Sequence, residues 1–442
     1  MTQSNPISGR RVWQLAWPMI LSNISVPLLG AVDTAILGHL PSAEYLSGVA
    51  IGASVMSMLL WAFGFLRMGT TGLVARSRDG GSDWLLRALL LALLLGTALN
   101  LLAAPLLDSA VRWMNASAEA APHAHVYLQI RLLSAPLALA NYALLGFFIG
   151  RQDGRAPLLI LLAANLLNIL LDFVLIVGFD LGARGAAVAT VCADICAFIL
   201  GLRLLSRVEA DIWQSLAARL RRPDFQPQHD AAPWLELLRI NGDLFLRTCL
   251  LLLTFTFFTA QGAAQGDTVL AANAILLQLL MMTSYALDGF AHATEALVGE
   301  AIGTKSVRMF HSAVRSAGLW ALATAILITL LLATGRSWLL PLFTDLTAVQ
   351  AQAQSVYAWL CALPLIAVWS YQLDGIFIGA GKSREMRNTM FVATVLIFFP
   401  VWWFTRSWGN HGVWFSLFLW TGARSVGLLV YYGYYTSNRS WM

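Results

Sequence analysis

The sequence predicts an all-α, polytopic membrane protein of twelve transmembrane helices in two pseudo-symmetric six-helix lobes. Composition, a series of long apolar runs and an internal repeat lead to this prediction. Of the 442 residues, 58% are hydrophobic and only 12% are charged, whereas soluble domains carry about 25% charged residues. Because a soluble chain of this length needs a large polar surface, a soluble enzyme and a disordered chain are both excluded.

Long apolar runs fill most of the chain. A transmembrane helix needs about 20 mostly apolar residues. Twelve runs bounded by charge, Gly or Pro meet this requirement: 13–37, 47–74, 84–108, 124–149, 156–178, 184–206, 237–262, 268–301, 312–335, 353–379, 386–405 and 410–434. The first run has no small-residue cleavage site and reaches full membrane length, so we expect a retained helix rather than a signal peptide.

The distribution of Lys and Arg orients the spans, because these residues accumulate on the cytoplasmic side. With the N-terminus inside, 20 of the 28 basic residues fall on cytoplasmic segments or helix ends. Five fall outside, namely Arg112, Arg131, Arg184, Arg336 and Arg406, and Arg67, Arg247 and Arg424 lie within spans. We therefore expect both termini to be cytoplasmic. The excess of basic residues is therefore explained by the membrane topology and does not indicate nucleic-acid binding.

Three pairs of segments recur at offsets of 224, 229 and 227 residues. The pairs are GTTGLVAR at 69–76 with ATEALVGE at 293–300, GFFIG at 146–150 with GIFIG at 375–379, and GARGAAV at 182–188 with GNHGVWF at 409–415. They predict an N-terminal lobe at 1–206, a cytoplasmic linker at 207–236 and a C-terminal lobe at 237–442. Since six spans is an even number, the two lobes have the same orientation and enclose a central cavity.

Ionisable residues within spans are costly and are functional candidates by default. In the first half, Asp33 lies in the first span, and the fifth span carries Asn165, Asn168 and Asp172 on one helix face. Thr190 and Asp194 form a polar face on the sixth span. Desolvation and mutual repulsion favour the protonated form of one of two converging carboxylates. This group could therefore carry H⁺, or hold Na⁺ with nearby amide and hydroxyl oxygens; interhelical hydrogen bonding is the structural alternative.

The second half has its own polar face on the eighth span. It comprises Tyr285, Asp288, His292 and Glu295, and Asp374 lies in the tenth span. These side chains could form a second proton or cation site or an anionic lining for cationic substrates. The alternative is charge pairing with buried Arg67, Arg247 or Arg424. Asp243 and Arg247, four residues apart, are most simply a local ion pair.

Catalytic and nucleotide motifs are missing from the sequence. GAGKS at 379–383 lacks the first Gly of a phosphate-binding loop and follows a membrane span rather than a strand. No HExxH or GxSxG motif occurs. We expect a protein that is not an enzyme, has no cofactor besides its coupling ion, and takes energy from an ion gradient.

The chain resembles the multidrug and toxic compound extrusion (MATE) family, specifically its DNA-damage-inducible (DinF) branch. The resemblance rests on PLLGAVDTAILGHL, NILLDFVLIVGF followed by GAAVATV, YALDGFAHATEA and LDGIFIGAGKSREMRN. It implies that Asp33 matches an essential first-helix carboxylate, with Asn168, Asp172 and Thr190 as its partners in a cation site. It also implies that Asn141 faces substrate and that Pro18 bends the first helix. The acids of the second half do not match the family's sodium site one for one.

We therefore expect a bacterial inner-membrane antiporter that exports cationic or amphiphilic organic compounds in exchange for H⁺, or for Na⁺ bound at Asp33, Asn168, Asp172 and Thr190. The substrate-cavity candidates are Asn141, Asn165, Tyr285, Asp288, Glu295 and Asp374. The expected partners are small organic substrates, the coupling cation and membrane lipid, with the chain as a monomer. The alternative is a lipid-linked oligosaccharide flippase, which would favour basic residues in the cavity to hold pyrophosphate.

Overall fold

The computed structural model describes residues 6–441 except for 39–42, 78, 80, several positions between 103 and 118, and most of 209–229. The side chains of most residues between 26 and 46 are also outside the described part. Helices, with no strand, make up the secondary structure of the described residues. Most of the predicted linker at 207–236 lies outside them.

The chain divides into two compact units. The N-terminal unit comprises residues 21–74 and 79–241, and the C-terminal unit comprises residues 1–20, 75–78 and 242–442. The first helix, α1 (Gly9–Gly38), contributes to both units. The lobe boundaries at 206 and 236 stay a prediction.

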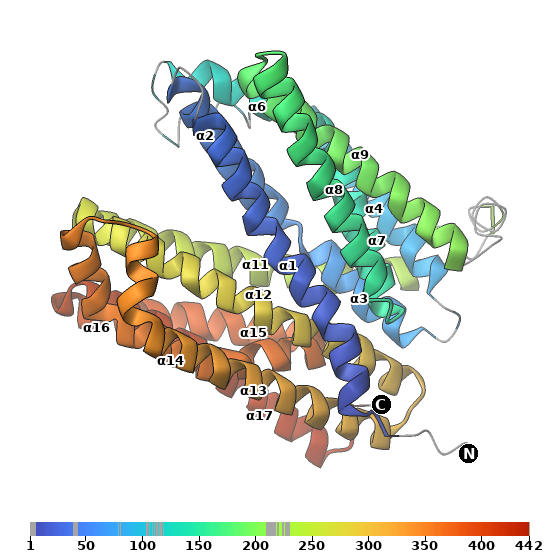
Figure 1. The fold of residues 1–442 in the computed structure, drawn as a ribbon. Coiled ribbons are helices and arrows are strands. Elements are labelled where there is room, and N and C mark those ends of the chain that lie inside the picture. The colour runs from blue at the N-terminus through green and yellow to red at the C-terminus, as the bar shows by residue number, and fades with distance from the viewer. Residues whose placement is uncertain are drawn as a thin grey trace. The chain divides into compact units, whose positions relative to one another are not determined.

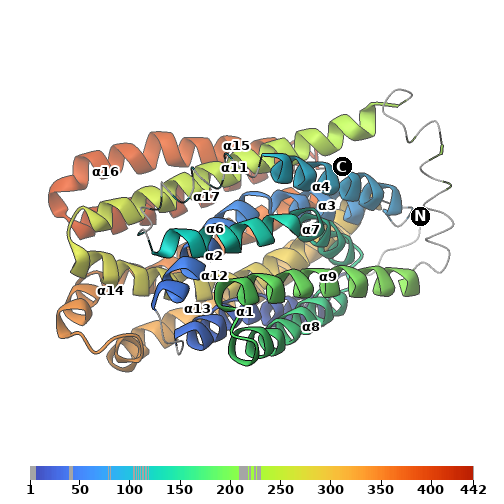
Figure 2. The same ribbon diagram turned by 90° about the horizontal axis from the view of Figure 1, so that it is seen from above.

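The N-terminal unit contains seven further α-helical elements among its described residues, with one π-helical segment (Figure 1). They are α2 (Ala43–Ala62), α3 (Phe65–Arg76), α4 (Ser82–Leu101), α6 (Ala120–Leu133), α7 (Ala135–Gly150), α8 (Arg155–Asp172), the π-helix η1 (Phe173–Gly178) and α9 (Gly182–Val208). Helices α8 and α9 lie side by side in Figures 1 and 2 and are in contact. Pro136 lies in the first turn of α7, where a proline is tolerated, and α6 and α7 form a pair bent by 53°.

Among its described residues, the C-terminal unit contains several long helices and shorter helical segments, and the first of the long helices begins in the N-terminal unit, which extends to residue 241. They are α11 (Ala232–Ala263), α12 (Asp267–Gly303), α13 (Val307–Leu339), η3 (Leu340–Leu342), α14 (Thr347–Gly379), α15 (Ser383–Phe391), the π-helix η4 (Val392–Phe398), α16 (Phe399–Thr405), η5 (Arg406–Trp408) and α17 (Asn410–Ser437). Helix α14 contacts α12, α13 and α17, and it is the most buried of the candidate spans among the described residues. It is therefore the central helix of this unit.

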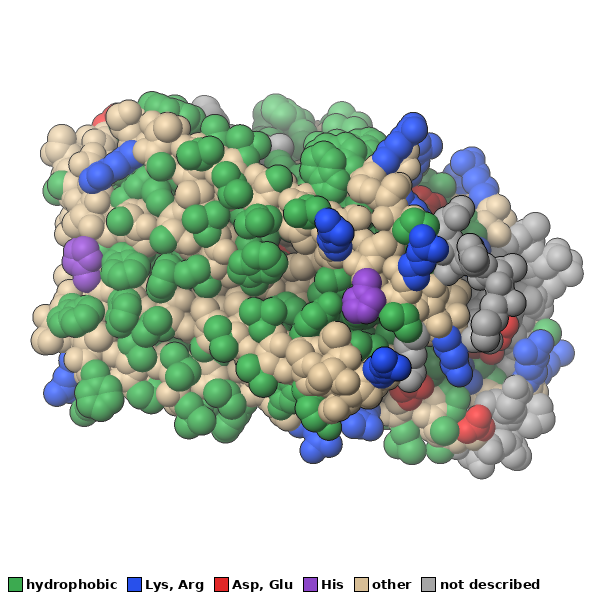
Figure 3. Space-filling model, turned by 90° about the horizontal axis from the view of Figure 1, so that it is seen from below, with side chains coloured by type: hydrophobic (Ala, Val, Ile, Leu, Met, Phe, Trp, Pro, Cys, Tyr) green, Lys and Arg blue, Asp and Glu red, His purple; other side chains and the backbone are tan. Residues whose placement is uncertain are grey.

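Ten described helical segments are long and apolar enough to cross a membrane, or eleven if the bent pair α6–α7 forms one span. Helix α1, whose residues are only partly described, is not among them. On the face drawn in Figure 3, hydrophobic side chains are spread widely over the surface, and most of the visible Lys and Arg lie toward one end. This apolar surface suits hydrocarbon rather than water. The all-α polytopic fold is confirmed, and the count of twelve helices is approximately supported.

The repeated glycine motifs make the same contact in both units. A Cβ atom at Gly146 would lie 2.5 Å from the carbonyl oxygen of Arg67, and one at Gly375 would lie 2.5 Å from that of Ala291. Arg67 and Ala291 each precede a member of the first repeated segment pair by two residues. Only glycine allows helices to approach this closely. The two segment pairs are therefore structural equivalents within their units.

Candidate ion and substrate site

The polar face of α8 is buried in the N-terminal unit. Asn168 is 0% exposed and Asp172 is 1% exposed, whereas Asn165 is half-buried. Asn168 donates a long hydrogen bond of 3.5 Å to the hydroxyl of Thr190 on α9, and that hydroxyl donates to the carbonyl oxygen of Ala186 at 2.9 Å. The Oδ1 atom of Asn168 accepts no hydrogen bond from the described residues. A buried acceptor without a donor is costly and is suited to a cationic ligand.

The backbone changes geometry directly after Asp172. The α-helix α8 ends at this residue, and the π-helix η1 begins at Phe173. Single π-helical turns within α-helices occur frequently at functional sites. The same change occurs in the eleventh predicted span, where η4 follows α15, but there the residue before the π-helix is Phe391. Of these two π-helices, only η1 in the N-terminal unit is therefore preceded by an acidic residue.

The second half of helix α1 contacts the polar face of α8. Asn165 donates a 3.0 Å hydrogen bond to Ser25, which is the interhelical bond that the structural alternative predicts. Further along α1, Ile36 belongs to one hydrophobic cluster with Ile176 and Ala186. Asp33 lies in α1, and its side chain is outside the described part of the structure.

Three of the predicted ion-site residues lie close along the chain to members of this hydrophobic cluster. Asp33 precedes Ile36 by three residues, and Asp172 precedes Ile176 by four. Thr190 follows Ala186 by four residues. Since one helical turn takes 3.6 residues, each of these three residues lies about one turn from the shared cluster.

Asn141 lies in a second polar group of the N-terminal unit. Its Nδ2 atom donates to the backbone oxygen of Asp194 at 3.0 Å, and its Oδ1 atom accepts no bond from the described residues. The Asp194 carboxylate pairs with Arg131 at 2.6 Å and accepts a bond from Ser134 at 2.9 Å. Arg131, one of the five basic residues assigned to the outside, is therefore a buried partner of Asp194, and its side chain is 6% exposed.

Arg131 and Ser134 act together on Asp194. The two residues are three apart at the junction of α6 and α7, and Arg131 also donates to the Ser134 hydroxyl at 2.9 Å. A polar pair at a helix break can meet a buried carboxylate on a neighbouring span. Asp194 itself signals the need for such a partner, because an unpaired charge in a span is costly.

In the C-terminal unit, the predicted face of α12 divides into separate groups. His292 and Glu295 form a pair, with Nδ1 and Oε1 3.2 Å apart. Glu295 is 1% exposed, and its Oε2 atom has no hydrogen-bond partner among the described residues. Tyr285 and Asp288 are only half-buried.

The carboxylate of Asp374 pairs with two cationic side chains. Its Oδ2 atom accepts hydrogen bonds from Arg247 on α11 and from Arg424 on α17, the latter at 3.0 Å. All three side chains are less than 10% exposed. Of the alternatives that the sequence leaves open for Asp374, the structure shows pairing with buried arginine.

The expected local pair of Asp243 and Arg247 is wrong. Asp243 pairs with Arg387 on α15 at 2.7 Å and accepts a hydrogen bond from Ser383 at 2.9 Å. Both partners lie far along the chain, so spacing within α11 does not reveal them. Arg247 is instead used by Asp374, because a deeply buried carboxylate needs a charged partner.

Comparison with known proteins identifies the family. The MatE family model matches residues 18–174 and 244–404, which is more than half of the chain. The chain belongs to the MatE family. The two matched segments fall on either side of the predicted linker, and the MatE match confirms the resemblance found in the sequence motifs.

Relatives of this MatE protein span nearly its whole length. It is 39% identical to the DNA damage-inducible protein F of Escherichia coli K12, over 98% of this chain and 94% of that protein. It is 25% identical to a probable multidrug resistance protein NorM of Pseudomonas syringae, over 96% and 95% of the two chains. A solved structure described as the outward-facing conformation of a multidrug resistance MATE family transporter of the MOP superfamily has a TM-score of 0.85. That structure is 20% identical, with 97% of this chain and 96% of that chain covered.

Proposed function

We propose that this protein is an ion-coupled antiporter that exports small organic compounds across the bacterial inner membrane. The names of the relatives support export, since they describe a multidrug resistance protein and a multidrug resistance transporter. Both alignments cover almost the whole chain. Both termini are cytoplasmic in this proposal, and the chain acts as a monomer surrounded by lipid.

One observation carries the coupling mechanism, namely the buried carboxylate and amide on α8. Asp172 and Asn168 are almost fully enclosed, and the Oδ1 atom of Asn168 receives no donor from the described residues. A carboxylate in this setting can bind a proton from the outside and release it inside as access alternates. Asp33 is the second carboxylate, because it lies about one turn from the same hydrophobic cluster as Asp172.

The same oxygens could also hold Na⁺. Hard cations prefer carboxylate, amide and hydroxyl oxygen ligands, and Asp33, Asp172, Asn168 and Thr190 carry these groups. The proposal favours H⁺, since a proton needs only one carboxylate, and it assigns Na⁺ to the same four residues if sodium drives transport. No group of three or more His, Cys, Asp and Glu side chains forms a metal site among the described residues.

The exported compounds are cationic or neutral amphiphiles in this proposal. Asn141 and Asn165 supply amide groups in the N-terminal unit, and Tyr285, Asp288 and Glu295 supply polar groups in the C-terminal unit. Asp374 is removed from the substrate-binding set, since two arginines occupy it. A flippase for lipid pyrophosphates is less well supported, because Arg247 and Arg424 are already bound to a carboxylate.

Everted membrane vesicles test the proposal. Wild-type vesicles should accumulate an organic cation dye when a gradient of H⁺ or Na⁺ is imposed, and Asp172→Asn and Asp33→Asn should each abolish the gradient-driven part. Asp267→Asn is the matched control, since Asp267 is an exposed acid at the start of α12. Full transport by Asp172→Asn vesicles, with equal protein in the membrane, would show that the coupling site is elsewhere.

A further inference from the structure

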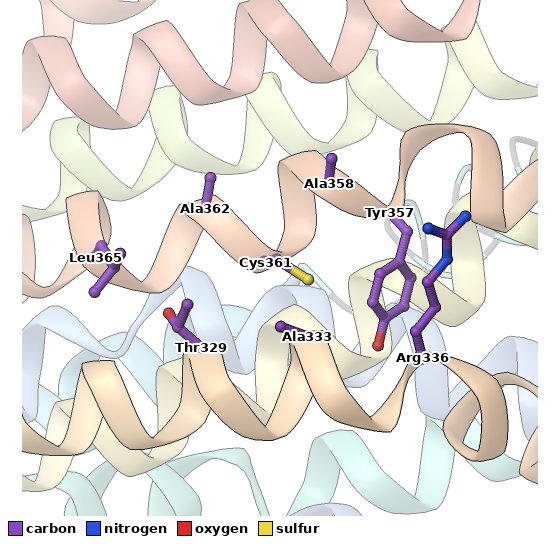
Figure 4. A pocket seen from close by; sticks show the side chains of 8 residues that line it. All are labelled: Thr329, Ala333, Arg336, Tyr357, Ala358, Cys361, Ala362 and Leu365. Carbon is purple, nitrogen blue, oxygen red and sulfur yellow. The ribbon is translucent and has the colours of Figure 1, made fainter.

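A groove lies between α13 and α14 in the C-terminal unit (Figure 4). Its volume is about 410 Å³, and Leu365 and Arg336 mark its two ends in the close-up. Three alanines, Ala333, Ala358 and Ala362, form much of its wall. Both helices are long and apolar enough to cross a membrane. The groove shares no residue with the candidate ion or substrate sites.

The side of α13 that borders the groove is exposed within the C-terminal unit. Ala333 and Ala358 are exposed, and Leu330 and Leu331 on α13 are each more than half exposed. In a chain that crosses the membrane, such side chains meet lipid. On the C-terminal unit taken by itself, the groove is therefore open at the surface formed by α13 and α14.

Arg336 gives the groove a charged end. Its side chain is exposed, donates one 3.1 Å hydrogen bond to the carbonyl oxygen of Gln354, and lies with Cζ 5.9 Å from the ring centre of Tyr357. No carboxylate of the described residues forms an ion pair with it. Two residues further on, Trp338 is 54% exposed, and exposed tryptophans are typical of the membrane–water boundary. Arg336 thus lies in the last turn of α13, near an exposed tryptophan, with no carboxylate of the described residues to compensate its charge.

The apolar part of the groove cannot select an occupant by itself. Lipid tails are as apolar as the side chains that they replace, so no hydrophobic driving force favours one apolar chain over another in the bilayer. Selection has to come from Arg336, whose guanidinium matches the geometry of a phosphate group. An anionic headgroup also compensates the charge, whereas a zwitterionic headgroup brings its own cation.

We propose that this groove binds a phospholipid with an anionic headgroup. The phosphate contacts Arg336, and one acyl chain lies along Ala333, Ala358 and Ala362. The lipid fills the groove, so that no void remains between α13 and α14, and it anchors the end of α13 at the membrane surface. None of the groove's lining residues belongs to the candidate ion or substrate sites, so this proposal holds whether or not the proposed coupling site is correct.

Native mass spectrometry of the purified protein tests this proposal with two probes, dioleoyl phosphatidylglycerol and dioleoyl phosphatidylcholine. Wild type should retain more of the anionic lipid than of the zwitterionic lipid. Arg336→Gln should lower retention of the anionic lipid about fivefold, the effect expected from one basic residue near a lipid surface. Arg336→Lys should keep most of the preference. Arg406→Gln is the matched control, since Arg406 is also exposed and lies 4.2 Å from the ring centre of Trp403.

A second variant tests the acyl-chain part without touching the charge. Ala362→Leu places a larger side chain in the groove and should lower retention of both lipids while Arg336 is intact. Equal retention of the two lipids by wild type would overturn the proposal. The proposal also fails if Arg406→Gln lowers retention as much as Arg336→Gln, or if Ala362→Leu leaves retention unchanged.

Discussion

Gly375 packs against the backbone of Ala291 so closely that a methyl group at Gly375 would lie 2.5 Å from the Ala291 carbonyl oxygen. Gly146 has the same relationship with Arg67 in the other unit. The contact joins α14 to α12, and α7 to α3, through segments that the sequence repeats. This close helix–helix contact therefore occurs in both halves of the chain and is not specific to one helix pair.

Gly375→Ala and Gly146→Ala should each destabilise the protein by about 1–3 kcal/mol, because added volume forces packed helices apart. The amount of protein that stays folded after heating in detergent, measured by size-exclusion chromatography, checks this. Gly318→Ala on α13 is the control, since nothing lies within 4 Å of a Cβ atom there. If all three variants unfold at the same temperature, the close packing of these glycines against the neighbouring helix does not contribute to stability.

Asp374→Asn should destabilise the C-terminal unit by about 3–5 kcal/mol, since it leaves Arg247 and Arg424 buried without their charged acceptor. The same heating assay measures the loss. Adding Arg247→Met should recover part of the stability, because one of the two uncompensated charges is then removed. Wild-type stability of Asp374→Asn would mean that the two arginines are satisfied by other groups and that Asp374 is open to a functional role.

The pairing of Asp243 can be tested by double-mutant cycles. Asp243→Asn combined with Arg387→Gln should show a coupling energy of about 1 kcal/mol, whereas Asp243→Asn with Arg247→Gln should show almost none. The first value is modest because the Arg387 side chain is one third exposed and water weakens its ion pair. A larger coupling of Asp243 to Arg247 would restore the local pair that sequence spacing suggests.

Hydrophobicity is sufficient to predict the all-α polytopic fold class. The apolar runs indicate helices because hydrocarbon requires every backbone polar group to bond within its own segment. The GFFIG and GIFIG motifs also predict equivalent positions, and Gly146 and Gly375 occupy them. The 53° bend between α6 and α7 is not predictable in this way. Pro136 lies in the first turn of α7, and a proline at that position is compatible both with an unbent helix and with a bend between two helices.

The polar residues are predicted less completely than the fold. One-helix spacing places Asn165, Asn168 and Asp172 on a common face, because positions 3, 4 and 7 apart coincide on a helix. The same rule gives the wrong partner for Asp243, and the charge distribution assigns Arg131 to the outside without revealing its partner Asp194. Their partners come from helices that are distant in the chain, and sequence spacing contains no information about which helices become neighbours.

In the proposed mechanism, the carboxylate of Asp172 carries the coupling ion together with Asp33, Asn168 and Thr190. The most direct test is ion movement in proteoliposomes after substrate addition, with H⁺ and Na⁺ gradients imposed separately. We predict that wild type moves one of these ions in step with the substrate, whereas folded Asp172→Asn protein binds the substrate and moves neither ion. Ion movement by Asp172→Asn equal to that of wild type would contradict this mechanism.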